Sequence, residues 1–158
     1  MIHYVAGDAT RPEGKGHKII VHICNDIGRW GKGFVLAISK RWKEPEKAYR
    51  QWYAHPANDN RMELGKIQPV RVSDDITVIN MIAQKGIYRS EGVPPIRYEA
   101  VRTCLNKVCR YASGIEDKPI SIHMPRIGCG LAGGNWREIE HIIRETLSDI
   151  DVYVYDLP

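Results

Sequence analysis

The chain of 158 residues lacks any apolar run close to the roughly 18 residues that a membrane-spanning helix needs. Residues 1–5 also lack the basic and apolar segments of a secretory signal. We therefore expect a cytoplasmic protein with no membrane partner. The content of 43% hydrophobic and 27% charged residues excludes a disordered or fibrous chain, and the length predicts a single domain over residues 1–158.

Cysteine pairs with metal-ligand spacing are missing as well. Cys24, Cys104, Cys109 and Cys129 form no C-x-x-C motif, so we expect no metal site and reduced, buried thiols. No block of five or six like charges occurs, and the formal net charge of +4 is spread along the chain. Such a mild positive excess suits any polyanionic ligand, including a small pyrophosphate. A nucleic-acid-binding module stays open as an alternative.

Short apolar runs alternate with amphipathic stretches along the chain. We predict strands at 2–6, 18–23, 66–72, 76–83, 119–124 and 151–157, and helices at 34–42, 45–53, after Pro95 and after Asn135. The turn at 73–75 predicts a hairpin, which makes the sheet mixed. The alternation predicts an α/β fold, a three-layer α/β/α sandwich around a mixed, mostly parallel central sheet.

Two glycine-rich segments follow buried strands and lead into helices, over residues 22–34 and 124–136. Ligands of open α/β sheets bind beyond the carboxyl ends of the strands, where such loops meet. Glycine lets backbone N–H groups approach a ligand, and a helix N-terminus favours phosphate. Together the segments predict a diphosphate clamp. Each alone is equally explained as a tight turn between a strand and a helix.

Four motifs resemble those of the macrodomain family: Gly-Asp-Ala-Thr at 7–10, His-Ile-Cys-Asn at 22–25 with the glycines of 28–33, Met-Pro-Arg-Ile-Gly-Cys-Gly at 124–130, and Val-Tyr-Asp-Leu at 154–157. They occur in the family's order and span nearly the whole chain. The most similar branch comprises ADP-ribose-1″-phosphate phosphatases and terminal ADP-ribose–glutamate hydrolases. The resemblance implies a monomer without cofactor that takes ADP-ribose or a derivative, with ADP-ribosylated protein or nucleic acid as possible substrates.

The resemblance also implies ligand-binding residues. The adenine would lie against Asp8 and the backbone of Ala9, with Tyr155 stacked on the base. The diphosphate and distal ribose would contact Trp30, Gly31, Lys32, Gly33 and Phe34 in the first segment and Arg126, Ile127, Gly128, Cys129, Gly130, Leu131, Ala132 and Gly133 in the second. The alternatives are Asp8 as a turn or cap residue, Tyr155 as a core residue of the last strand, and Trp30 as core packing. Lys32 and Arg126 are otherwise explained as solvated or structurally paired residues.

Catalysis would require a positioned water and stabilisation of the charge that leaves C1″ of the distal ribose. The resemblance implies His22 as the catalytic histidine of the phosphatase-like members, and Asn25 as the amide that orients the ribose or the water. His22 is otherwise explained as a buried strand residue. A non-catalytic ADP-ribose reader is the alternative function.

The glutamate-specific hydrolases use a lysine and an aspartate, and the chain departs from them at both positions. Gln84 and Ala132 stand there instead. Lys85 follows one residue later, and a shift of one residue on a strand turns the side chain to the opposite face. The departures favour a phosphatase or a binding role.

Overall fold

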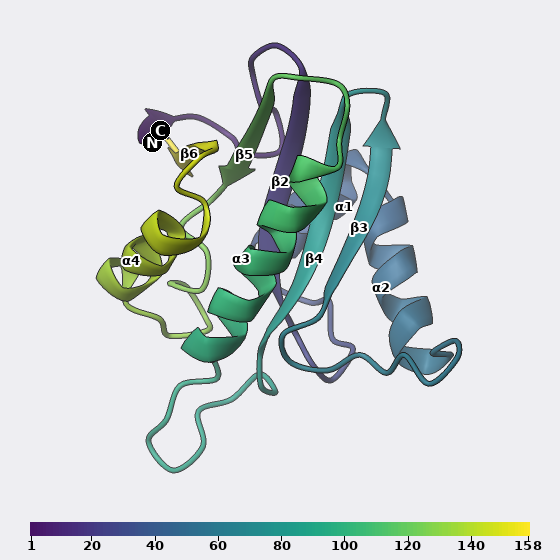
Figure 1. Cartoon of the computed structure of the whole chain (residues 1–158). Helices are drawn as coiled ribbons and strands as arrows, with labels where there is room; N and C mark the ends of the chain where they lie inside the picture. The colour runs from purple at the N-terminus through teal and green to yellow at the C-terminus, as the bar shows by residue number, and fades with distance from the viewer.

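Six strands form one sheet in the order β1-β6-β5-β2-β4-β3, and four helices cover it (Figure 1). The computed structural model describes all residues from 1 to 158. The elements are β1 Ile2–Ala6, β2 His17–Asn25, α1 Phe34–Arg41, α2 Glu44–Ala54, β3 Ile67–Ser73, β4 Ile76–Gln84, α3 Tyr98–Ser113, β5 Ile120–Met124, α4 Trp136–Thr146 and β6 Asp151–Asp156. None of the helices combines the length and the apolar character that a membrane span requires.

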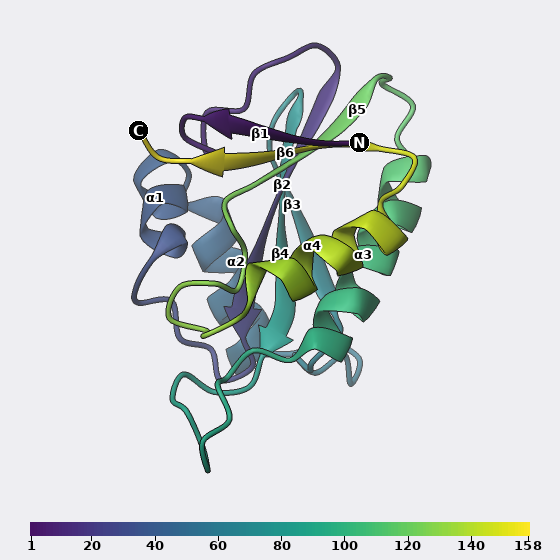
Figure 2. The same cartoon turned by 90° about the vertical axis from the view of Figure 1, so that its left-hand side faces the viewer.

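All neighbouring strands run parallel except β3 and β4, which pair antiparallel across the turn at 73–75. Helices α3 and α4 lie on one side of the sheet, and α1 and α2 lie on the other (Figures 1 and 2). The predicted mixed sheet and α/β fold class are therefore confirmed. The predicted bounds differ mainly at β2, which is longer at both ends than the apolar run because its polar residues also join the ladders.

The side chains of β2 alternate between two cores. Ile19 and Val21 pack toward α3 and α4, whereas Ile20 and Cys24 pack toward α1 and α2. A strand covered on both faces reads as a continuous apolar run, which is why the sequence shows no alternation there. The stripe predicted for α3, which includes Val101, Leu105 and Val108, is fully buried.

The parallel strands bring their carboxyl ends to one edge of the sheet. Asp8 follows β1, the two glycine segments follow β2 and β5, and Tyr155 lies near the end of β6. Figure 2 shows the connections that leave β1, β2 and β5 on the left-hand side of the molecule. Residues far apart in the sequence thus surround one region.

Substitution of Leu105 by Ala is expected to destabilise the protein by about 2–5 kcal/mol, because the removed methyl groups leave a cavity between α3 and the sheet. Denaturant unfolding measures the difference. Asn106→Ala, on the exposed side of the same helix, is the control and should change stability by less than about 0.5 kcal/mol. Equal effects of the two substitutions would contradict the assignment of the α3 core face.

Candidate ligand-binding site

Loop one (26–33) and loop two (125–135) lie side by side because β2 and β5 are neighbours in the sheet. A Cβ atom added to Gly128 of loop two would lie 3.1 Å from Cδ1 of Ile23, near the end of β2. The two glycine segments are therefore adjacent in space, as a clamp requires.

The glycines of these loops serve two different purposes. An added Cβ would lie 2.3 Å from the Tyr53 ring at Gly28, and 2.3 Å from Cδ1 of Ile96 at Gly128. These glycines allow the loops to pack closely on neighbouring side chains. At Gly31, Gly33 and Gly130, by contrast, no heavy atom of another residue lies within 4 Å of an added Cβ. The space beside these three glycines is open.

Backbone donors next to this open space have no partner in the protein. The N–H groups of six loop residues donate to no backbone or side-chain oxygen: Gly31, Lys32, Gly33, Gly130, Leu131 and Ala132. Both loops contribute three of them. Unpaired N–H groups that face open space next to glycine form a suitable site for anionic oxygens.

The two helices that follow the loops differ at their N-termini. Gly33 caps α1 without any side-chain hydrogen bond, and the first turn holds no acidic residue. The α4 N-terminus is occupied by Asn135, whose Oδ1 accepts from the N–H of Arg137 at 2.9 Å. The partial positive charge of a helix start is therefore available to a ligand at α1 and not at α4.

Asn25 shapes loop one from within. Its Oδ1 accepts from the N–H groups of Ile27 and Arg29, both at 3.1 Å, and its Nδ2 donates to the carbonyl of Arg29 at 2.7 Å. The hydroxyl of Tyr49 also donates to Oδ1 at 2.8 Å. These bonds occupy Oδ1 and one of the two Nδ2 hydrogens, so the geometry gives Asn25 a structural task. A contact of the second Nδ2 hydrogen with the ribose stays a prediction.

His22 lies in the core under α1 and α2 with 2% of its surface exposed. Its Nε2 lies 2.5 Å from Oδ1 of Asn80, whose Nδ2 donates elsewhere, so Nε2 carries the proton of the neutral ring. Burial lowers the pKa of His22 to about 4. The ring packs edge-on against Trp30, with 5.4 Å between the centroids. His22 is thus enclosed by side chains of the core, which supports the buried-residue alternative, and its catalytic role stays a prediction.

Trp30 also belongs to this core. It is 4% exposed, its Nε1 donates to Oγ of Ser39 at 2.7 Å, and its ring packs on Tyr49. An indole held in this way is part of the core, which agrees with the packing alternative. A contact of Trp30 with the ligand stays a prediction.

Arg126 is engaged in an ion pair. Its Nε and Nη2 donate to the two carboxylate oxygens of Asp156 at 2.7 and 2.9 Å, and its guanidinium lies over the rings of Tyr4 and Trp136. These contacts give Arg126 a structural role and leave its Nη1 without a partner, so a contact of Arg126 with phosphate stays a prediction. Lys32 is exposed and forms no ion pair, and the same holds for Arg29, so loop one presents two unpaired cations.

The remaining residues of loop two support its shape. Ile127 and Ala132 are buried, and the Ala132 carbonyl accepts from the N–H of Ile96. Cys129 is half-buried, and Leu131 is 70% exposed. The N–H of Gly133 donates to the carbonyl of Gly130 at 3.0 Å.

Phe34, at the start of α1, is half-buried beside His22.

Asp8 combines a turn role with a free oxygen. Its Oδ1 accepts from the N–H and the hydroxyl of Thr10, both at 2.8 Å, whereas Oδ2 has no partner. Partial burial acts to raise the pKa of Asp8, but the bonds from Thr10 and the charges of Arg41 and Arg11 outweigh it, so the pKa lies below its ordinary value. Asp8 is therefore ionised at neutral pH and able to accept a further hydrogen bond. Ala9 beside it is buried.

A cavity of about 440 Å³ borders Asp8, and sequence reasoning missed most of its lining. Arg11 from the segment after β1 and Lys40 and Arg41 from the end of α1 give it a positive character. Basic residues in the last turn of a helix also complement the helix dipole, so the sequence offered no specific signal for a cavity.

Lys85 lies beyond the end of β4, which stops at Gln84. Its side chain is exposed, and its N–H donates to the carbonyl of Pro95. The alternation of side chains along a strand therefore does not fix the direction of the Lys85 side chain. The argument against Lys85 as the lysine of the glutamate-specific hydrolases no longer applies. No carboxylate stands at Ala132, so the paired lysine and aspartate are still incomplete. No group of three metal-binding side chains is present.

Solved structures of other proteins share the fold of this chain over nearly its whole length. No protein-family model matches the chain. A protein of unknown function from Bacteroides thetaiotaomicron is 54% identical with a TM-score of 0.92, over 99% of this chain and 98% of that chain. A macrodomain protein from Streptomyces coelicolor is 48% identical with a TM-score of 0.85, over 99% of both chains. Thermosipho africanus DarTG in complex with ADP-ribose shares the fold at 16% identity and a TM-score of 0.69, over 89% of this chain and 38% of that chain.

The curated relatives include two named groups of proteins. Chromodomain-helicase-DNA-binding protein 1-like from Mus musculus is 31% identical over 99% of this chain, and the chain spans only 18% of that protein's length. The ADP-ribose 1″-phosphate phosphatase of Saccharomyces cerevisiae is 24% identical over 99% of this chain and 98% of its own length.

We expect the stability of the protein to fall as the pH drops from about 6.5 to 4. The unfolded state takes up a proton at His22 near its ordinary pKa of 6.5, whereas the folded state does so only near 4. The loss amounts to roughly 3 kcal/mol for such a histidine and is absent above pH 6.5. Denaturant unfolding at several pH values should show a smaller pH dependence for His22→Phe and an unchanged one for the exposed His55→Phe. A wild-type slope in His22→Phe would contradict the neutral, buried assignment.

Proposed function

Because the chain belongs to the macrodomain family, we propose that it binds ADP-ribose or a derivative substituted at C1″ of the distal ribose. The single observation that carries the proposal is the set of six unpaired N–H groups, three from each loop, beside glycines that open onto free space. Two phosphate groups joined by one oxygen present enough acceptor oxygens to use donors from both loops.

The charge of the site favours the same ligand. The open start of α1 contributes a partial positive charge, which is worth about 0.3–1 kcal/mol toward a neighbouring anion. Lys32 adds a full positive charge without an acidic partner. The diphosphate would therefore be held by loop one and loop two, with backbone groups as the main donors.

The adenosine end would lie between the first and last strands of the chain. Ala6 pairs with Asp156 across β1 and β6, which puts Asp8 and Tyr155 at the same end of neighbouring strands. The free Oδ2 of Asp8 is suited to accept from the adenine amino group, and Tyr155 offers an aromatic face to the base.

The proposed activity is hydrolysis at C1″, with ADP-ribose 1″-phosphate as the substrate and ADP-ribose and phosphate as products. It is supported by the phosphatase relatives, which match this chain over almost their whole length. ADP-ribosylated protein or nucleic acid are further candidates. A cytoplasmic location and a monomeric state belong to the same proposal.

A non-catalytic ADP-ribose reader is the second candidate, and a specific observation favours it. His22 is enclosed in the core and Asn25 is occupied by loop one, so neither is available to activate a water molecule in this conformation. Binding is common to both candidates, and turnover distinguishes them.

Calorimetry should show that ADP-ribose binds at least about tenfold more tightly than AMP, since only ADP-ribose carries the second phosphate and the distal ribose; a tenfold ratio corresponds to about 1.4 kcal/mol. Equal affinities would remove the loops from the binding site.

Gly130→Leu is expected to reduce ADP-ribose binding by about a hundredfold or more, because the new side chain fills the open space beside both loops. The fold should tolerate it, since Gly130 has no positive φ and no neighbour within 4 Å of an added Cβ. Gly114→Leu, at the end of α3, is the matched control. Unchanged binding by Gly130→Leu would contradict the clamp.

Incubation with ADP-ribose 1″-phosphate, O-acetyl-ADP-ribose and glutamate-linked ADP-ribosyl protein, followed by mass spectrometry, tests the activity. We expect release of phosphate from the first substrate. Binding without turnover of any of the three would identify the chain as a reader.

A further inference from the structure

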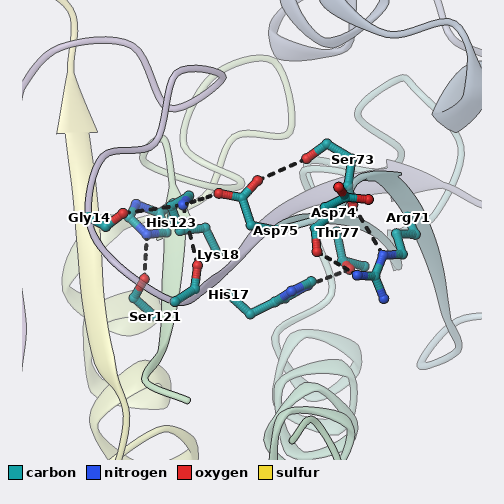
Figure 3. Close-up of polar contacts among 11 residues, drawn as sticks. Gly14, His17, Lys18, Arg71, Ser73, Asp74, Asp75, Thr77, Ser121 and His123 are labelled. Atoms are coloured by element: carbon teal, nitrogen blue, oxygen red, sulfur yellow. Dashed lines mark hydrogen bonds and ion pairs between the residues drawn. The ribbon is translucent and has the colours of Figure 1, made fainter. Parts of the chain in front are cut away.

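A polar pair of β5, the half-buried Ser121 and the buried His123, lies beneath the proposed adenine site. Ile122 and Met124 of the same strand point into the core under α3 and α4, so Ser121 and His123 face the other side of the sheet. The segment after β1 passes nearby and is fixed there by Lys18, whose Nζ donates to the carbonyls of Gly14 and Gly16. Figure 3 shows the contact between Ser121 and His123 and the contact of Lys18 with Gly14 of this segment.

His123 makes a polar contact at each ring nitrogen. Its Nε2 lies 2.7 Å from Oγ of Ser121, and its Nδ1 lies 2.7 Å from the hydroxyl of Tyr155. The ring is completely buried and stacks on Tyr153, with 5.1 Å between the centroids and an interplanar angle of 12°. Tyr153 in turn stacks on His3 at 4.7 Å. Position and rotation of the His123 ring are therefore both fixed.

Tyr155 is held at its hydroxyl end by this pair. Its ring borders Gly7, where an added Cβ would lie 3.4 Å from Cδ2 of Tyr155, and Asp8 follows directly. The ring is half-buried, so part of it is available to a ligand. An aromatic ring whose hydroxyl is anchored loses less conformational freedom when a base stacks on it.

A serine next to a histidine also resembles a nucleophile and its base. That role does not fit here, because His123 has no exposed surface and its second nitrogen contacts a tyrosine hydroxyl instead of a carboxylate. Burial also lowers the pKa of His123 to about 4, which makes it a weak base. The arrangement is suited to holding Tyr155.

We propose that Ser121 and His123 are positioning residues that fix the ring of Tyr155 for stacking on the base of the ligand. Recognition of the adenosine end then depends on two side chains that never touch it. This inference rests on the proposed function, in which Tyr155 contacts the adenine.

A double-mutant cycle tests the proposal. His123→Phe keeps a ring that can stack on Tyr153 and removes both polar contacts, and Tyr155→Phe removes the anchored hydroxyl. Each is expected to weaken ADP-ribose binding about three- to tenfold, the range of one hydrogen bond, and the double variant should lose no more than either single one. Tyr153→Phe is the matched control in the same stack, since its hydroxyl has no partner, and should bind like wild type.

Inorganic pyrophosphate, which has no base, separates positioning from general structural damage. Its binding, followed by chemical-shift titration, should be unchanged in all variants, and the Tyr155 ring resonances should broaden or shift in His123→Phe. If His123→Phe does not fold, Ser121→Ala replaces it, with a smaller loss in the same direction. Additive losses in the cycle, or an equal loss of pyrophosphate binding, would overturn the proposal.

Failure of the proposed function gives a different result. If wild type does not bind ADP-ribose, or if Tyr155→Ala binds it as tightly as wild type, Tyr155 is not a base contact and the premise is wrong. If Tyr155→Ala weakens binding and His123→Phe does not, the premise stands and the positioning role is wrong.

Discussion

The hydrogen bonds of Asn25 are the constraint on which the open form of loop one depends. Its amide takes up the N–H groups of Ile27 and Arg29 and the carbonyl of Arg29, and Tyr49 of α2 holds the amide in place. One side chain therefore provides hydrogen-bond partners for these backbone groups of the turn. The N–H groups of Gly31, Lys32 and Gly33, which follow in the loop, are left without a protein partner, and the space beside Gly31 and Gly33 is open. A loop that closed on itself would use the same donors and present none.

Some glycines of the two loops are packed and others are uncovered, and this difference explains how a small domain keeps unpaired N–H donors without losing its shape. Ile96 packs against Gly128 in loop two, and Tyr53 packs against Gly28 in loop one, so the packed glycines fix the backbone. Gly31, Gly33 and Gly130 stay uncovered. The cost of unpaired N–H groups is small while water reaches them, and a ligand that replaces the water regains the bonds.

The fold could be predicted from the sequence because the patterns that indicate it lie in residues close together in the chain. The apolar stripe of α3, the turn at 73–75 and the continuous apolar run of β2 each depend on residues close together in the chain, and each was predicted. The positions of the two loops at one sheet edge also followed, because parallel strands place their carboxyl ends together.

The directions of single side chains did not follow from the sequence. Asn25 turns toward α2 because the ladder between β2 and β4 shifts register after Cys24, and such a bulge depends on the neighbouring strand. Arg126 is occupied by Asp156, 30 residues later, and His22 by Asn80, 58 residues away. A motif match assigns a residue type to a position but does not reveal its partner. The catalytic roles of His22 and Asn25 therefore stay predictions.

The pairing of β1 with β6 has a consequence for how the protein is made. These strands lie at opposite ends of the chain, yet Val5 pairs with Tyr155 and Ala6 with Asp156. During synthesis β1 is made about 150 residues before β6, so it has no neighbour in the sheet until residues 151–156 have left the ribosome. The region around Asp8 and Tyr155 is thus assembled after both glycine loops have been made, and a nascent polypeptide that ends before β6 would have the loops without this region.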